Sequence, residues 1–180
     1  MIRITKNFHI TILLLSFSCE EAKYELDNPY DPANMDLDPP AVFFHPPVVE
    51  ATFSDSISVE IYGLELEPAA GAHLRFDYDP VTLEYDTMVP GPFFKGDNDP
   101  VAVADTSEGT VDVFIYYLPD MESNQNEGGT WSIATIYFIA ENARGCSLEW
   151  DKSLTTLRDE NNLEVTINDF GNGWVNIKND

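Results

Sequence analysis

Short runs of β-branched and aromatic residues, separated by turn-forming residues, dominate the sequence from about residue 48 onward. The turn signals include Asp79-Pro80, Pro90-Gly91-Pro92 and Gly128-Gly129. No amphipathic pattern long enough for a helix of three turns accompanies them, so the apolar residues have to be buried between strands. We expect strands over residues 56–62, 72–78, 101–105, 110–118, 131–140, 147–150, 163–168 and 173–177. This pattern predicts an all-β fold, an antiparallel β-sandwich.

The first 18 residues have the features of an export signal. Arg3 and Lys6 precede an apolar run from Phe8 to Phe17, which is shorter than the roughly 20 residues that a membrane-spanning helix requires. The run ends in Leu-Ser-Phe-Ser-Cys at residues 15–19, which resembles the lipobox of bacterial lipoproteins. The resemblance implies that residues 1–18 are removed and that Cys19 carries acyl chains, the only contact with a membrane that we expect. It implies a place in the cell envelope, which in a Gram-negative bacterium would be the outer membrane or the cell surface. An ordinary cleaved signal peptide is the alternative.

Residues 19–47 are proline-rich and acidic, and they lack a sustained strand or helix pattern. Proline fixes the backbone and removes hydrogen-bond donors. We therefore expect an extended tether over residues 19–47 and a folded domain over residues 48–180.

The chain carries 32 acidic and 9 basic residues, a formal net charge of −23. This charge excludes nucleic-acid binding, which depends on Lys and Arg neutralising phosphates. Hydrophobic residues make up 43% of the chain and aromatic residues 12%, more than a disordered acidic segment would contain, so we expect a core. With Cys19 lipidated, Cys146 has no intramolecular partner. We expect a buried, unreactive thiol there and no disulfide.

Three stretches carry a resemblance to a known family. They are LRFDYDPVTLEYDTMVPG at residues 74–91, GTWSIATIYFIAENARGCSLEW at residues 129–150 and FGNGWVNI at residues 170–177. In their order and spacing they resemble the cohesin domain, a jelly-roll β-sandwich with which bacteria dock partners that carry dockerin modules. The resemblance covers about residues 48–177. It implies a jelly-roll topology and a binding or scaffolding role. Related sandwiches that bind carbohydrate share this architecture, so a carbohydrate-binding module is the alternative.

Alternation along the strands predicts which side chains face outward. We expect Leu74, Phe76 and Tyr78 in the core, with Phe114 and Tyr116 of a second strand. In the cohesin-like arrangement, the outward residues fall on the sheet with which the family grips dockerin, and aromatic and aliphatic anchors beside polar groups suit docking. The predicted partner-binding residues are His73, Arg75, Asp77, Val113, Ile115, Tyr117, Thr135 and Tyr137.

The sequence departs from the family before the first of these strands. Many cohesins carry a polar Asn-Xaa-Asp arrangement there, whereas this chain has Ala70-Gly71-Ala72-His73. A partner other than dockerin is therefore equally open. The outward residues also have a simpler interpretation, in which they pack against a loop such as residues 119–128 or lie scattered on the surface.

The motifs that carry catalysis are missing from the sequence. After the signal segment only His45 and His73 remain as histidines, outside any close-ligand pattern, and no nucleophile elbow or phosphate-binding loop occurs. We expect no enzyme activity, no catalytic residues and no cofactor.

Calcium is the one ion whose ligand chemistry the sequence suits. Residues 96–100 and 159–162 crowd oxygen atoms into turns, but neither matches the twelve-residue calcium loop. Solvated acidic turns are the alternative.

Three tryptophans bear on the carbohydrate alternative, because exposed aromatic rings stack on sugars. Trp150 and Trp174 stand among apolar neighbours and are expected in the core. Trp131, at the start of its strand, is the candidate for sugar binding.

Overall fold

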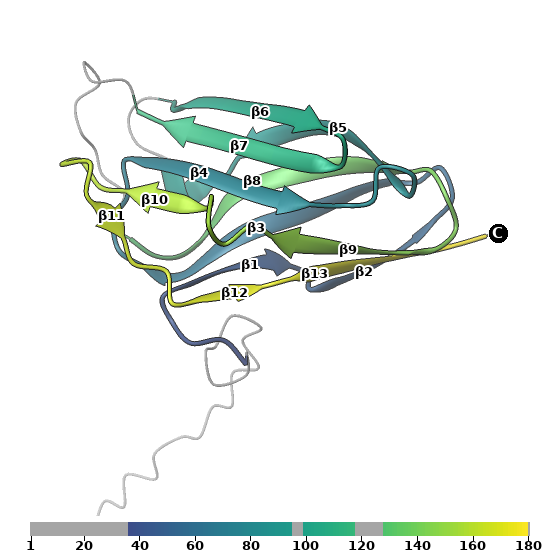
Figure 1. The fold of residues 1–180 in the computed structure, drawn as a ribbon, viewed down its shortest axis with the longest axis horizontal. Helices are drawn as coiled ribbons and strands as arrows, with labels where there is room; N and C mark the ends of the chain where they lie inside the picture. Colours follow the sequence, from purple (N-terminus) through teal and green to yellow (C-terminus); the bar gives the residue numbers. More distant parts are fainter. Residues whose placement is uncertain (1–35, 95–98, 118–127, 180) are drawn as a thin grey trace, which may run out of the picture.

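Two β-sheets stacked face to face make up the part of the chain that the computed structural model describes, residues 36–94, 99–117 and 128–179 (Figure 1). One sheet has the strand order β12-β1-β3-β8-β5. The other has the order β11-β10-β4-β9-β13-β2 and continues from β4 through β7 to β6. The strands are β1 (Ala41–His45), β2 (Val48–Thr52), β3 (Ser56–Leu66), β4 (Gly71–Asp77), β5 (Leu83–Pro90), β6 (Val101–Ser107), β7 (Thr110–Tyr116), β8 (Gly129–Ala140), β9 (Gly145–Trp150), β10 (Thr156–Arg158), β11 (Glu164–Val165), β12 (Asp169–Gly171) and β13 (Gly173–Lys178).

The predicted all-β jelly-roll sandwich is confirmed. The only helical element in the described residues is one turn of 3-10 helix, η1 (Pro92–Phe94). Most strand pairs are antiparallel, but two parallel pairs, β1 with β12 and β2 with β13, join the first strands to the last. The sequence pattern did not indicate these two parallel pairs.

The folded part begins earlier than residue 48. Strand β1 lies within the expected tether, and its residues Ala41, Val42, Phe43 and Phe44 are fully or almost fully buried. The prolines that suggested a tether flank this strand on both sides and do not interrupt it. The boundary expected at residue 47 is therefore wrong, because β1 belongs to the sandwich. Residues 1–35, with Cys19, lie outside the described residues.

An aromatic cluster joins the two sheets. Phe44 of β1 stacks on Trp150 of β9, with ring centroids 4.5 Å apart and planes 17° apart. The same ring meets Phe76 of β4 edge-on at 5.1 Å. Buried aromatic pairs of this kind contribute both apolar area and specific ring contacts. The predicted inward positions of Leu74 and Phe76 are confirmed, since both are fully buried.

Trp174 does not join this core, and its expected burial is wrong. Its side chain is 46% exposed on the outer side of β13, and its ring covers the backbone of Gly145, where an added Cβ would lie 2.2 Å from the indole. The neighbouring Val175 and Ile177 supply the buried side chains of β13 instead. Successive side chains of a strand point to opposite faces. Because Val175 and Ile177 point into the core, Trp174 points outward.

Truncating Phe44 tests the role of this cluster. We expect Phe44→Ala to lower the free energy of unfolding by about 3–5 kcal/mol, because it leaves a cavity between the sheets. Urea unfolding followed by tryptophan fluorescence measures the change. The control is Val48→Ala, at a side chain that is 53% exposed, where we expect a change within about 0.5 kcal/mol. Equal losses in the two variants would contradict this account of the core.

Candidate functional site

The outer face of β6, β7, β4 and β10 is the candidate functional site, and we call it the β4–β7 face. Directly paired residues of an antiparallel sheet share a face. Across β4 and β7, His73 pairs with Phe114 and Arg75 with Asp112. Val103 of β6 pairs with Phe114 from the other side, and Thr156 of β10 pairs with His73. His73, Phe114 and Val103 therefore form one row across three strands.

The inward and outward residues of β7 are the reverse of those predicted. Val113 and Ile115, expected outward, are fully buried, whereas Phe114 and Tyr116 are 37% and 43% exposed. The aliphatic side chains of alternate residues fill the space between the sheets, and Asp112 stands in the same phase as the two aromatic rings. A carboxylate is costly to bury, so Asp112 is the sequence signal that could have fixed the phase.

Three more of the predicted residues, Tyr117, Thr135 and Tyr137, do not lie on the β4–β7 face. Tyr117 follows the end of β7, is half-buried, and donates its hydroxyl hydrogen bond to the carbonyl of Phe94. Thr135 and Tyr137 lie on β8, in the five-stranded sheet, where they pair with Glu60 and Ser58 of β3. They are on the opposite side of the sandwich and cannot share a surface with His73 and Arg75. Of the predicted residues, His73, Arg75 and Asp77 are the ones that lie on the β4–β7 face.

A polar network fixes the side chains in the middle of this face. Asp112 accepts from His73 Nε2 at 2.7 Å through Oδ1 and pairs with Arg75 Nη1 at 3.2 Å through Oδ2. Arg75 Nε lies 3.8 Å from a carboxylate oxygen of Asp151. The hydrogen bond from the Ser153 hydroxyl lowers the pKa of Asp151, so this carboxylate stays charged. The His73 ring also stacks on Phe114 at 4.4 Å. The rings of His73 and Phe114 are thus held in place by contacts within the chain.

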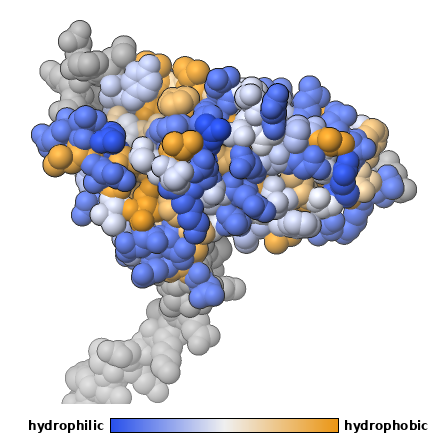
Figure 2. All heavy atoms as spheres, viewed as in Figure 1, coloured by the Kyte–Doolittle hydropathy of each residue, from blue (hydrophilic) through white to orange (hydrophobic). Residues whose placement is uncertain are grey.

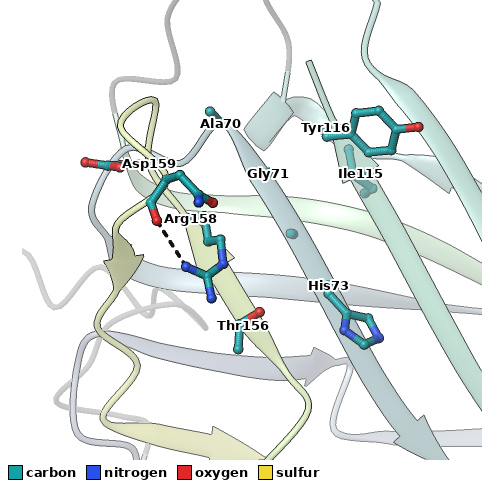
Figure 3. Close-up of a pocket in the computed structure, with 10 residues that line it drawn as sticks. Ala70, Gly71, His73, Ile115, Tyr116, Thr156, Arg158 and Asp159 are labelled. Carbon is teal, nitrogen blue, oxygen red and sulfur yellow. Dashed lines mark hydrogen bonds between the residues drawn. The ribbon is translucent and has the colours of Figure 1, made fainter. Parts of the chain in front are cut away.

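A hollow of about 320 Å³ adjoins these rings over the start of β4 (Figure 3). Gly71 lies between Arg158 on one side and Tyr116 on the other, because both are its direct strand partners. The hollow is lined by Ala70, Gly71, Ala72, His73, Ile115, Tyr116, Thr156, Arg158, Asp159 and Asn162. Figure 2 shows a surface of the molecule on which hydrophilic groups predominate and apolar groups are scattered between them.

The described residues do not form the calcium site that the sequence suggested. They contain no group of three or more His, Cys, Asp or Glu side chains that could hold a metal ion. The carboxylate of Asp159 is used within its own turn, where it accepts from the backbone N–H of Leu163 at 2.7 Å and of Asn161 at 2.9 Å. These bonds lower the pKa of Asp159. The other predicted turn, residues 96–100, lies mostly outside the described residues.

Cys146 and Trp131 lie where the sequence predicted. Cys146 is buried, and its burial raises the pKa of the thiol. Trp131 is 52% exposed on β8, and its indole N–H donates to the carbonyl of Gly128 at 3.1 Å. Because β8 belongs to the five-stranded sheet, Trp131 lies away from the β4–β7 face. Within the described ranges, no helix has the length and apolar character needed to cross a membrane.

The similarities of the chain to known proteins concern its fold. The sequence matches no family model and no curated protein. Its structure is similar to that of a non-cellulosomal cohesin from the archaeon Archaeoglobus fulgidus, with 15% identity, a TM-score of 0.61, and coverage of 76% of this chain and 89% of that one. A type II cohesin domain from Acetivibrio cellulolyticus is similar at 15% identity, a TM-score of 0.62 and coverage of 76% and 94%. A type I cohesin in complex with its dockerin, from Clostridium thermocellum, is similar at 11% identity, a TM-score of 0.63 and coverage of 81% and 97%. The chain therefore has the cohesin fold.

A pair of neighbouring substitutions tests the orientation of β7. We expect Val113→Asp to lower the free energy of unfolding by more than about 3 kcal/mol or to prevent folding, because it buries a charge. Phe114→Asp places the same side chain on the surface and should cost about 1 kcal/mol or less. Denaturant unfolding of both variants measures the difference. A greater loss in Phe114→Asp would mean that β7 presents its other face to the core.

Proposed function

We propose that the chain is an exported, lipid-anchored module that docks a protein partner on the β4–β7 face, and that its role is binding and not catalysis. The observation that carries this proposal is the presence of exposed Phe114, Tyr116 and Val103 in one patch on a chain with a net charge of −23. Clustered apolar side chains on an otherwise charged surface are typical of protein interaction sites.

The form of the patch supports docking of a protein. Interface hot spots consist of aromatic anchors at the centre with polar groups around them. Here Phe114 and Tyr116 are the anchors, and the Asp112 network supplies fixed charges beside them. Because Phe114 and the Asp112 network are already held in place, their part of the interface requires little further ordering of side chains.

The cohesin fold supports the same role. The similar structures include cohesins in complex with dockerins, from Clostridium thermocellum and Acetivibrio cellulolyticus. The resemblance in the sequence implies that the family binds dockerin on the sheet that contains the strand of residues 71–77. A dockerin-like module is therefore the partner that we propose to test first.

The proposed anchor is Cys19, at the end of the apolar run of the signal segment. Acyl chains on this residue would hold the protein at the cell envelope, and the proline-rich residues that follow would separate the sandwich from the membrane. The acidic chain is repelled by anionic lipid, so the lipid anchor would supply the membrane contact.

Trp131 favours carbohydrate binding as a second candidate function, because its indole is exposed and held by the bond to Gly128. This site would use the five-stranded sheet and not the β4–β7 face. The two functions can therefore be separated by substitution.

The docking prediction uses a double variant. The chain is titrated by calorimetry against a panel of dockerin modules, and we expect at least one to bind. Phe114→Ala/Tyr116→Ala should weaken that binding by roughly 30-fold or more, because it removes the hot-spot rings.

Trp131→Ala is the matched control, since it removes an exposed aromatic ring from the other sheet. We expect it to leave dockerin binding unchanged. Binding that is lost in Trp131→Ala and retained in the double variant would contradict docking on the β4–β7 face. Binding to polysaccharide alone, lost in Trp131→Ala, would favour the carbohydrate function.

The anchor prediction concerns the full chain expressed in a bacterium with a lipoprotein pathway. We expect the native chain to incorporate label from an alkyne analogue of palmitate and to sediment with membranes. Cys19→Ala should lose both the label and the sedimentation, because the acyl attachment site is absent. A native chain that stays unlabelled and soluble would contradict lipidation.

A further inference from the structure

We infer that the hollow beside Gly71 receives an acidic side chain, an aspartate or glutamate of the docked protein, against the guanidinium of Arg158. The inference rests on the proposed function, because it names one contact within the same docking face. It follows from the shape of the hollow, from the pairing of the basic residues and from the groups that line its walls.

The shape of the hollow depends on the missing side chain of Gly71. A Cβ added at this residue would lie 3.5 Å from the Ile115 carbonyl oxygen and from Tyr116 Cβ, which is ordinary van der Waals contact. The backbone at Gly71 does not have a positive φ. The fold therefore accepts a larger residue here, and the effect of glycine is to keep the hollow open. Its volume of about 320 Å³ is at the small end of ligand sites and suits a single side chain.

Arg158 differs from the other basic side chains in the described residues. Arg75 pairs with Asp112 and Asp151, Arg144 with Asp79, and Lys178 with Glu50. Lys152 lies over the ring of Phe170. No carboxylate of the described residues lies within 4.0 Å of the Arg158 guanidinium.

The guanidinium of Arg158 is held instead by a neutral group. Its Nη1 donates to the backbone carbonyl of Asn162 at 3.0 Å (Figure 3). The neighbouring Asp159 carboxylate points away in Figure 3 and is used by backbone N–H groups of its own turn. Glu164 is the cross-strand partner of Arg158, but it forms no ion pair with it. Although the chain has 32 acidic residues, the Arg158 guanidinium is bonded to a neutral carbonyl. Its positive charge can therefore pair with an acidic group of another molecule.

The walls of the hollow favour a carboxylate over other groups. A guanidinium presents several N–H donors in a planar fork that matches the two oxygens of a carboxylate. The Thr156 side chain, beside the Arg158 guanidinium in Figure 3, carries a hydroxyl group and also lines the hollow, whereas the Tyr116 hydroxyl points away from it. His73, stacked on Phe114, forms a flat rim next to it. A carboxylate on a short aliphatic stem would therefore meet donors at its head and apolar surface along its stem.

The net charge of −23 restricts what the rest of the partner can be. Over distances greater than the Debye length of about 8 Å at 0.15 M salt, the field of the chain is screened, but nearer acidic groups are repelled. The partner should therefore present one acidic residue at the hollow and a neutral or basic surface around it.

A small probe tests the hollow without knowledge of the partner. The ¹⁵N-labelled chain is titrated at 0.15 M salt with N-acetylglutamate N-methylamide and, separately, with N-acetylglutamine N-methylamide, which has the same shape and no charge. We expect the glutamate probe to shift the Gly71 amide and the Arg158 Nε signals with a Kd of about 1 mM, typical for a ligand of this size. The glutamine probe should bind at least tenfold more weakly. Equal shifts from the two probes, or no saturable shift from the glutamate probe, would overturn the inference.

Three variants locate the binding. Arg158→Gln should weaken glutamate-probe binding at least tenfold, whereas Glu164→Gln, the matched control on the adjacent strand, should retain it. Gly71→Val should fill the hollow and abolish binding while the melting temperature stays the same or rises, because valine favours strands and has space at this position. Probe binding that persists in Arg158→Gln or in Gly71→Val would overturn the inference.

The result is separable from the proposed function. If dockerin binding depends on Phe114 and Tyr116 but the glutamate probe does not bind, the carboxylate inference falls and the docking face stands. If the probe binds as expected and no dockerin or other protein docks on this face, the proposed function falls and the carboxylate site stands.

Discussion

The contact of Phe44 with Trp150 and Phe76 is the interaction on which the rest of the structure depends, because it closes one sheet onto the other. Once Phe76 is committed to the core, alternation along β4 leaves His73, Arg75 and Asp77 on the outside. The pairing of β4 with β7 then sets which side of β7 shares that surface. The composition of the β4–β7 face is therefore a consequence of core packing on β4 itself and of the direct pairing of β4 with β7.

In the proposed function, the β4–β7 face combines two kinds of recognition that act over different distances. Phe114 and Tyr116 offer apolar surface. Removing this surface from water on binding would favour association, and this effect does not depend on direction. The network around Asp112 and the guanidinium of Arg158 offer charges with fixed geometry, which discriminate between partners more than they add affinity. The absence of a side chain at Gly71 leaves a hollow in this face, which we propose as the place where a partner's side chain enters.

The fold could be predicted because its signals are local, whereas five of the eight predicted site residues do not lie on the β4–β7 face. Alternation with turn residues gave the sandwich, and the phase of β4 followed from Leu74 and Phe76. The predicted phase of β7 is wrong because Phe114 and Tyr116 alternate with Val113 and Ile115, which are also apolar. Asp112, in phase with the two rings, is the residue that distinguishes the two sets. The prediction that Thr135 and Tyr137 share this face is wrong for a different reason. Alternation within β8 does not reveal to which sheet the strand belongs. The short β10, which carries Arg158 and Thr156, has only three residues and no periodic signal. The hollow arises from its pairing with β4, a contact between distant segments.

Hydrogen–deuterium exchange of the chain, free and saturated with the dockerin module that it binds most tightly, tests the docking face most directly. The account predicts that binding protects peptides covering β4, β6 and β7, residues 71–77 and 101–116. Protection confined to β3, β5 and β8, on the opposite side of the sandwich, would contradict it.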